Sequence, residues 1–188
     1  MNEPLSIVRI PIDRVPVLLG KNGETKKRIE EGGRVRLIVD SQNGEIHIFQ
    51  NGDPILAALA PEVIRAVGRG FNPEKASMLY SEGMQLAVIP LREFAKAGSH
   101  RIVEIKGRII GRSGRTRRTI EMLTDAHICV YGDTVSIIGN LTSLPFAMEA
   151  IRMIINGRKH RTVYQYLERF KREEKGRKIR ESFGDILE

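Results

Sequence analysis

Hydrophobic positions in this chain fall into short β-branched runs and longer stripes with helical spacing, which follow one another in the same order twice. Each copy starts with a β-branched run (6–10 and 86–90) and a short apolar segment that stops at a glycine. A helix opens at a second glycine, two β-branched runs joined by turn residues indicate a hairpin, and a last helix closes the copy. In the first copy we expect the helix GETKKRIEEGG to stop at Gly32 and Gly33. The predicted order of elements is β-α-α-β-β-α, twice.

The two copies align most clearly around the paired glycines. VLLGKNGETKKRIE (17–30) and RIIGRSGRTRRTIE (108–121) share five identities at a constant offset of 91. The offset falls to 87 in the last helix, where EVIRAVGRG (62–70) lies opposite EAIRMIING (149–157), so loops of the second copy are shorter. Self-similarity at a fixed spacing is the signature of a duplicated structural unit.

Two further segments interrupt or join the copies. Asn72-Pro73-Glu74 combines an N-cap, a proline at the first helical position and a first-turn acid, which predicts a linker helix that stops by Gly83. The second copy holds an insertion before its first glycine. There, REFAK predicts a short helix and HRIVEIKGRII a longer one with Ser99 as its cap.

One more helix follows the second copy, with an apolar stripe at helical spacing. The stripe consists of Val163, Tyr166, Leu167 and Phe170. We expect its continuation, KREEKGRKIR, to fray because it is almost entirely charged. These boundaries predict a first domain at 1–71, a linker helix at 72–84 and a second domain at 85–188 that includes the insertion and the last helix.

Composition adds a strongly basic balance. The chain has 188 residues, of which 41% are hydrophobic, enough for a sizeable core, and its formal net charge is +8 with a pI near 9.9. Residues 1–90 hold 11 basic and 11 acidic side chains, whereas residues 91–188 hold 20 and 12. The whole excess therefore lies in the second half. Such a charge favours an anionic partner, either nucleic acid or an acidic membrane face.

Membrane insertion and disulfide chemistry are disfavoured. No apolar stretch approaches the roughly 20 residues of a spanning helix and no signal-like segment opens the chain, so we expect a cytoplasmic protein. Cys129 is the one cysteine and lies in the apolar run HICVY, where a small buried side chain is the ordinary interpretation.

The paired glycines carry the candidate chemistry. GKNG (20–23) and GRSG (111–114) each precede a helix, so they offer backbone N–H groups and the positive end of a helix dipole to a phosphate. Glycine lets a sugar-phosphate chain approach without a Cβ in the way, and Lys21 or Arg112 can reach phosphate oxygens. One such loop would ordinarily be a capped helix with a solvated basic face. Its recurrence in both copies favours a nucleic-acid site.

Nucleotide-binding motifs do not fit the same residues. GKNGET lacks the GxxxxGK[ST] spacing of a P-loop, and neither copy places GxGxxG between a strand and a helix with an acid about 20 residues later. No cofactor is therefore predicted. Because only 5% of residues are aromatic and tryptophan is absent, recognition of bases by stacked aromatic platforms is disfavoured as well.

The duplicated unit resembles type I KH domains, whose GxxG loop clamps about four nucleotides of single-stranded RNA. Generic KH domains often have an apolar residue three positions after the second glycine, where this chain has Lys26 and Arg117. The pattern G-x-T-basic-x-x-I-E is instead similar to the archaeal and eukaryotic Krr-one and Partner-of-Nob-One family of ribosome-biogenesis proteins. Tandem units, the insertion and INGRKHRTVYQYL after the last helix extend the similarity over most of the chain.

The resemblance implies an α+β fold of two tandem type I KH domains, each a three-stranded antiparallel sheet packed on helices. It also implies a non-catalytic protein that binds small-subunit rRNA near its 3′ end during ribosome biogenesis and rRNA processing, alongside the endonuclease that matures that end. Archaeal relatives are also linked to the α subunit of initiation factor two. The first unit is usually degenerate in eukaryotic members. Here it keeps Gly20 and Gly23, so we expect it to contribute weakly beside the basic second unit.

The candidate RNA-binding residues occupy three kinds of position. Phosphates would lie on the loops, at Gly20, Lys21, Asn22, Gly23, Gly111, Arg112, Ser113 and Gly114. Basic side chains of the following helices would reach them: Lys26, Lys27, Arg28, Arg115, Arg117 and Arg118. Bases would lie against apolar residues before the loops (Val17, Leu18, Leu19, Ile109, Ile110) and along the next strand (Leu37, Ile38, Ile128, Cys129). Backbone groups of that strand could hydrogen-bond base edges.

Two alternatives are open at this point. A metal-dependent RNA-processing enzyme would need clustered acids or metal-ligand spacing, and the histidines at 47, 100, 127 and 160 are scattered. We interpret Glu30 and Glu121 as fold-supporting or charge-balancing rather than as acid-base catalysts. A protein-interaction adaptor would instead dock its basic surface on an acidic partner, with the helix at 161–172 as a further contact.

Overall fold

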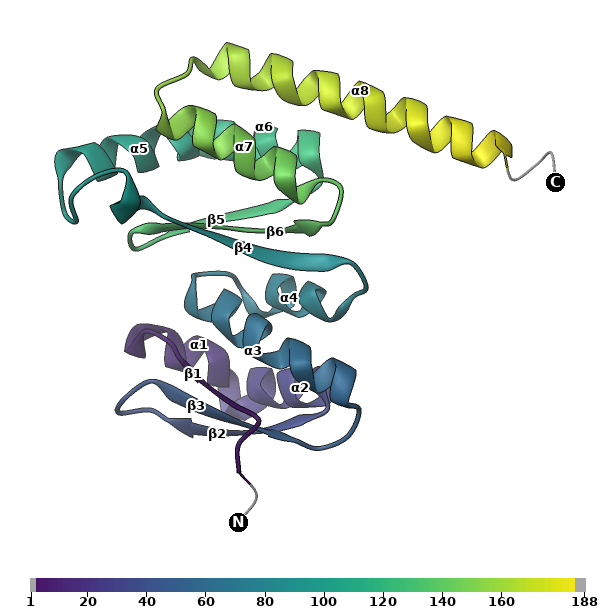
Figure 1. Cartoon of the computed structure of the whole chain (residues 1–188). Helices are drawn as coiled ribbons and strands as arrows, with labels where there is room; N and C mark the ends of the chain where they lie inside the picture. Colours follow the sequence, from purple (N-terminus) through teal and green to yellow (C-terminus); the bar gives the residue numbers. More distant parts are fainter. Residues whose placement is uncertain (1–2, 185–188) are drawn as a thin grey trace.

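Two three-stranded sheets and their helices are stacked one above the other in the computed structural model, which describes residues 3–184 apart from the side chains of 178 and 181–184 (Figure 1). We call the stretch 6–68 the first unit and 84–155 the second unit. In each unit helices cover one face of the sheet, and the other face of the second sheet rests on the first unit. A long last helix covers the helices of the second unit and extends past them.

The first unit confirms the predicted order of strands and helices. Its elements are β1 (Ser6–Arg9), η1 (Ile12–Arg14), α1 (Val15–Leu19), η2 (Lys21–Gly23), α2 (Glu24–Gly33), β2 (Val35–Asp40), β3 (Glu45–Gln50) and α3 (Pro54–Gly68). The strands pair antiparallel in the order β1-β3-β2, with Leu37 opposite Ile48 and Val8 opposite Ile46. All four are buried, because alternate residues of a strand share one face and this face meets the helices.

The second unit has the same strand order and the predicted insertion, although REFAK forms no α-helix beyond a 3₁₀ turn at Leu91–Glu93 and the Ser99 side chain makes no cap hydrogen bond. Its elements are β4 (Met84–Pro90), η4 (Leu91–Glu93), α5 (His100–Ile110), η5 (Arg112–Gly114), α6 (Arg115–Thr124), β5 (His127–Tyr131), β6 (Thr134–Asn140) and α7 (Leu144–Ile155). The antiparallel sheet runs β4-β6-β5, matching β1-β3-β2 strand for strand. The chain is therefore α+β, with one antiparallel sheet per unit.

Strand β6 is buried on both faces because its sheet lies between two layers of helices. Ile137 belongs to the core of the second unit, whereas the next residue, Ile138, packs into the core of the first. Leu86 and Cys129 also pack against the first core. The two units consequently share an apolar interface.

The segment between the units begins as predicted but is shorter. Helix α4 (Pro73–Ala76) is capped by Asn72, whose Oδ1 accepts from the Lys75 N–H, and continues as the 3₁₀ turn η3 (Ser77–Tyr80). Burial raises the pKa of Tyr80, and its hydroxyl donates to Ile29 O at 3.1 Å. The linker is thereby hydrogen-bonded to α2.

Helix α2 stops at the two glycines, as predicted, with Gly33 as its last residue. The left-handed residue that caps the helix is Arg34 (φ 50°), directly after Gly33, and neither glycine takes that conformation. A Cβ on Gly33 would lie 2.6 Å from the Tyr80 hydroxyl and one on Gly32 would lie 3.0 Å from its ring. These glycines make room for a tyrosine from the linker.

Helix α8 (His160–Gly184) packs by its predicted stripe. Val163 and Leu167 are fully buried, and Phe170 stacks on Phe146 of α7 with 3.8 Å between ring centroids. The expected fraying of KREEKGRKIR is wrong, since α8 runs through it. Lys, Arg and Glu are strong helix formers, and oppositely charged residues one turn apart stabilise a helix.

Candidate nucleic-acid interface

The two glycine loops have the same backbone shape. Gly20 (φ 70°, ψ −179°) follows α1 and Gly111 (φ 70°, ψ 172°) follows α5. The third and fourth residues of each loop also have positive φ, between 51° and 77°. Each loop therefore turns sharply before α2 or α6 begins.

The first glycine of each loop is required by a close approach as well as by its φ. A Cβ on Gly20 would lie 2.2 Å from Thr25 Oγ1, and one on Gly111 would lie 2.2 Å from Thr116 Oγ1. The loop folds tightly over the threonine two positions after the second glycine, which explains the shared G-x-T. At Gly23 a Cβ would meet no described atom within 4 Å, so this side of the loop is open to a ligand.

The glycine amides are not free, contrary to expectation. The Gly20 N–H donates to Pro16 O at 2.9 Å and the Gly23 N–H to Gly20 O at 3.3 Å, and the second loop repeats both bonds. Among the described residues, the N–H groups of Lys21 and Asn22 have no acceptor, and the same holds for Arg112 and Ser113. A phosphate would therefore meet the two middle amides of each loop.

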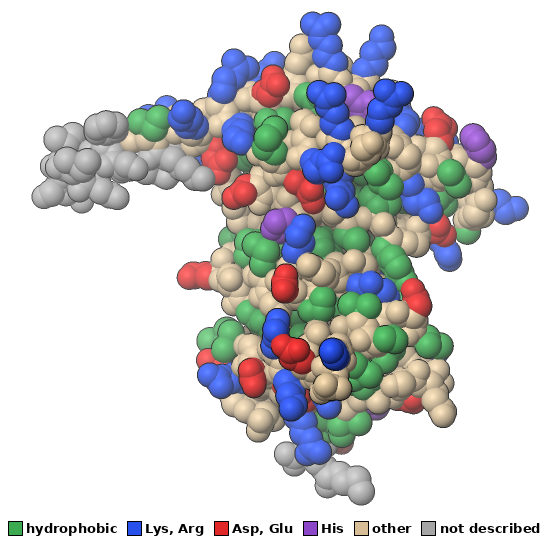
Figure 2. All heavy atoms as spheres, turned by 180° about the vertical axis from the view of Figure 1, so that it is seen from behind, with side chains coloured by type: hydrophobic (Ala, Val, Ile, Leu, Met, Phe, Trp, Pro, Cys, Tyr) green, Lys and Arg blue, Asp and Glu red, His purple; other side chains and the backbone are tan. Residues whose placement is uncertain are grey.

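Basic side chains are more numerous near the second loop than near the first, and Figure 2 shows Lys and Arg gathered over the upper half of the molecule, the second unit. Arg115 and Arg118 are exposed, and Arg118 Nη2 donates to Ser113 O at 2.7 Å, which brings its guanidinium to the loop. The first unit has Glu24 at the position of Arg115, and this acid is paired with Arg28. In the first unit Lys21 and Lys27 are also exposed. The charge near the second loop is therefore less neutralised.

The prediction that the side chains of Leu37 and Ile128 contact bases is wrong. They are 1% and 4% exposed and pack in the two cores, because every second residue of β2 and β5 faces the helices. Leu18 and Ile109, before the loops, are also fully buried. Ile38 is exposed, but it points to the opposite face of its sheet. A run of consecutive apolar residues does not show which of them point into the core and which could contact a base.

A glutamate from each helix binds the outer edge of the strand next to it. Strands β2 and β5 lie at sheet edges. The Leu37 N–H donates to Glu30 Oε1 at 2.7 Å, and the Ile128 N–H donates to Glu121 Oε1 at 2.8 Å. Both acids thus support the fold, as interpreted from the sequence. The sequence did not reveal that both carboxylates lie at the edge of β2 or β5.

The same glutamates explain the departure from the generic KH pattern. Lys26 Nζ lies 3.7 Å from Glu30 Oε1, and Arg117 Nε lies 3.7 Å from Glu121 Oε2. A basic residue one helical turn before each glutamate pairs with it and is half-buried. Lys26 and Arg117 therefore face the strand edge beside the loop.

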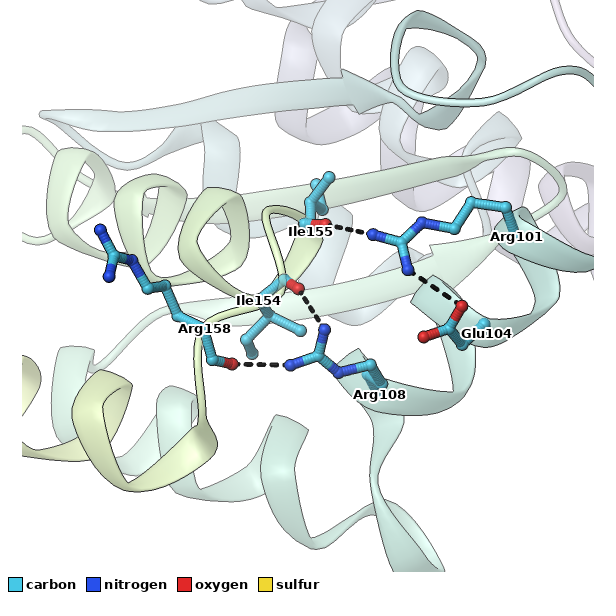
Figure 3. Close-up of polar contacts among 6 residues, drawn as sticks. All are labelled: Arg101, Glu104, Arg108, Ile154, Ile155 and Arg158. Atoms are coloured by element: carbon cyan, nitrogen blue, oxygen red, sulfur yellow. Dashed lines mark hydrogen bonds and ion pairs between the residues drawn. The ribbon is translucent and has the colours of Figure 1, made fainter.

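Helix α5, which leads into the second loop, is held by arginines (Figure 3). Arg108 donates to Ile154 O at 3.0 Å and to Arg158 O at 2.6 Å, and Arg101 donates to Ile155 O at 3.1 Å. The Ile154 and Ile155 carbonyls lie at the C-terminal end of α7, where a helix has a negative dipole end, and the Arg158 carbonyl lies in the turn after it. The arginines fix α5, and hence Gly111, relative to the core.

Replacing Arg108 by methionine is expected to lower the free energy of unfolding by about 1.5–3 kcal/mol, because two hydrogen bonds donated by a charged guanidinium are lost. Denaturant unfolding followed by circular dichroism measures this. Arg161→Met, at an exposed position of α8, is the matched control and should change stability by less than about 0.5 kcal/mol. Equal effects of the two substitutions would contradict the structural role of Arg108.

Helix α8 braces the second loop from the other side. The Tyr164 hydroxyl donates to Thr116 Oγ1 at 3.3 Å, the His160 Nε2 lies 2.9 Å from Arg108 O, and Lys171 Nζ donates to Met122 O at 2.7 Å. These partners are 48 to 52 positions apart, so no local pattern could predict them.

Other reactive groups have ordinary structural settings. Burial raises the pKa of the Cys129 thiol and lowers the pKa of His127. Among the side chains that the structure describes, no three of His, Cys, Asp or Glu gather as metal ligands would. The part of the chain that the structure describes also contains no helix with the length and apolarity needed to cross a membrane.

The second unit matches a known protein family. Residues 85–172 match the family model of the second KH domain of Partner-of-Nob-One, described as a eukaryotic type KH domain (KH domain type I). A KH domain-containing protein of Methanocaldococcus jannaschii is 41% identical over 171 residues, which span 89% of this chain and 74% of the relative.

Three solved structures resemble the whole arrangement. A protein of unknown function from Aeropyrum pernix has a TM-score of 0.92 at 35% identity, with 98% of this chain and all of that one covered. Dim2p from Pyrococcus horikoshii has a TM-score of 0.82 at 42% identity, covering 87% and 98%. A chain in the a/eIF2alpha–aDim2p–rRNA complex from the same organism has a TM-score of 0.84 at 42% identity, covering 89% and 94%.

Proposed function

The chain belongs to the archaeal branch of the Partner-of-Nob-One family of KH-domain proteins, and on this premise we propose that it binds single-stranded rRNA through two tandem KH units. The RNA would be the 3′ region of small-subunit rRNA, bound without catalysis during ribosome biogenesis. The proposed domains are 1–71 and 85–188, joined by 72–84. The shared element order and strand order support the assignment of the first unit as a second copy of the same fold.

The observation that carries the proposal is the duplicated loop. In both units two adjacent backbone amides without an acceptor stand at the start of a helix, beside exposed basic side chains. Phosphate binds at helix N-termini through such amides and the helix dipole. A single loop of this kind would be ambiguous, and two at equivalent positions favour a polymer of phosphates.

The solved structures support the choice of RNA and of a protein partner. One similar chain was crystallised with rRNA and a/eIF2alpha. We therefore propose an α subunit of initiation factor two as a partner of this chain. The endonuclease that matures the rRNA 3′ end is proposed as a second partner from the family resemblance, and co-purification from cells tests both.

The salt dependence of binding measures how many phosphates the protein neutralises. If the second unit holds about four phosphates, log K against log salt should fall with a slope near −2.8, about −0.7 per phosphate. Arg112→Ala should reduce the magnitude of this slope by about 0.7, whereas Arg69→Ala, at an exposed position after α3, should leave it unchanged. A slope near zero in the unaltered protein would contradict a phosphate-binding surface.

Fluorescence anisotropy with labelled RNA oligonucleotides provides these values. The probes are a single strand with the sequence of the small-subunit rRNA 3′ end, a shuffled strand and the corresponding duplex. The proposal predicts tightest binding of the rRNA strand and weakest binding of the duplex. Preference for the duplex would overturn it.

A further inference from the structure

The same carboxylate contact recurs in both units at the place where bases would lie. In each unit, the edge strand next to the loop helix directs a backbone N–H outward, and Glu30 or Glu121 accepts it. The sequence alignment pairs these glutamates at offset 91, and it pairs the strand residues Leu37 and Ile128 at the same offset. Repetition of the whole contact after duplication indicates a common role.

This contact changes the hydrogen-bonding character of the strand edge. An open edge presents alternating N–H donors and C=O acceptors, either of which can pair with a base. With the N–H occupied, the groups left at this point are carboxylate oxygens, each of which has two acceptor sites. Beside Leu37 or Ile128, the strand edge therefore presents an acceptor where a bare strand would present a donor.

The carboxylates are accessible and surrounded by positive charge. The Glu30 and Glu121 side chains keep 22% and 17% of their surface exposed. A hollow lined by Glu30, Glu31, Arg34, Val35, Arg36 and Asn51 runs along the edge of the first unit. Lys26 or Arg117 flanks each carboxylate and offsets its repulsion of the RNA backbone.

We propose that Glu121, and more weakly Glu30, selects guanine in the bound RNA strand. The inference rests on the proposed RNA-binding function and adds base specificity to it. Guanine carries two adjacent donors, N1–H and N2–H, on its Watson–Crick edge, and a carboxylate accepts both. Adenine and cytosine offer one amino group beside an acceptor, and the N3–H of uracil lies between two carbonyls that a carboxylate repels.

Glu121 could also serve only to link α6 to β5, and the substitution Glu121→Gln separates this structural role from guanine selection. In Glu121→Gln the amide oxygen can still accept from the Ile128 N–H, so the link between α6 and β5 is kept. The other oxygen becomes an NH₂ donor, which cannot accept from guanine. The structural role predicts unchanged base preference, whereas the proposed role predicts its loss.

The experiment measures anisotropy of labelled oligouridine of about twelve nucleotides, roughly three times the footprint of one KH unit, with a single central G, A, C or U. We expect the unaltered protein to bind the G strand about tenfold more tightly than the others. Glu121→Gln should reduce this preference to about twofold or less while binding of the all-U strand stays within about twofold. Glu82→Gln, an exposed glutamate in the turn before β4, removes the same charge and should keep the preference.

A change in the RNA tests the same contact without altering the protein. Inosine lacks the N2 amino group, so replacing the central G by inosine should weaken binding by about five- to tenfold. Replacement by 7-deazaguanine, which keeps the Watson–Crick edge, should have no such effect. Equal binding of all four strands, or a G preference that survives in folded Glu121→Gln, overturns the inference. If no strand binds at all, the proposed function fails with it.

Discussion

A variant in which Arg112 and Ser113 are both aspartate is expected to bind single-stranded RNA about 100-fold more weakly than the unaltered protein. The two open amides of the second loop belong to these residues, and the Arg112 side chain points to solvent beside them. Two carboxylates would repel phosphate and would remove the arginine contact. Loss of two charge-assisted hydrogen bonds at about 1.5 kcal/mol each gives this factor.

The matched control is the same change in the first loop, Lys21→Asp with Asn22→Asp. Because Glu24 and Arg28 already neutralise each other there, this loop has less charge to lose, and we expect a decrease of about fivefold. Both variants keep every loop glycine, so circular dichroism should show an unchanged fold. Equal losses, or a larger loss at the first loop, would contradict the ranking of the two units.

Local pattern was sufficient to predict most of the fold. The paired hairpins, the position of the linker and the stripe of α8 follow from periodicity and turn residues, which act over a few positions. The loops were also predictable, because glycine spacing and helix onset are local properties. The family resemblance added that each unit has a three-stranded antiparallel sheet packed on helices, whereas the order of the strands in each sheet came only from the structure.

The errors concern contacts between distant segments. Gly32 and Gly33 end α2 as predicted, but the sequence did not show that they make room for Tyr80 of the linker. Leu37 and Ile128 were expected to face bases because an apolar run does not reveal which side chains point inward. Arg108 fixes α5 through carbonyls at the end of α7 and in the turn after it, 46 and 50 positions away.

The interface between the units also depends on a distant contact, at Tyr131 near the end of β5. Its hydroxyl donates to Asp13, and the Arg14 guanidinium lies 5.6 Å from its ring centroid. Arg14 in turn donates to Val67 O at 2.9 Å, at the end of α3. Gly70 is the second residue after α3, and a Cβ there would lie 2.7 Å from Tyr131 Cβ. The chain leaves α3 in tight contact with the second sheet, which fixes how the two loops are placed relative to each other.

Gly70→Ala is accordingly expected to lower the free energy of unfolding by about 2–4 kcal/mol, from backbone strain at φ 99° and from the clash with Tyr131. Gly132→Ala separates the two causes. That glycine also has a positive φ (53°), but a Cβ there meets no described atom within 4 Å, so the cost should be about 1 kcal/mol. Guanidinium unfolding of both variants gives the difference, which measures the close approach of the units. If Gly70→Ala costs no more than Gly132→Ala, the two units are not held by this contact, and their loops need not bind one RNA strand in a fixed arrangement.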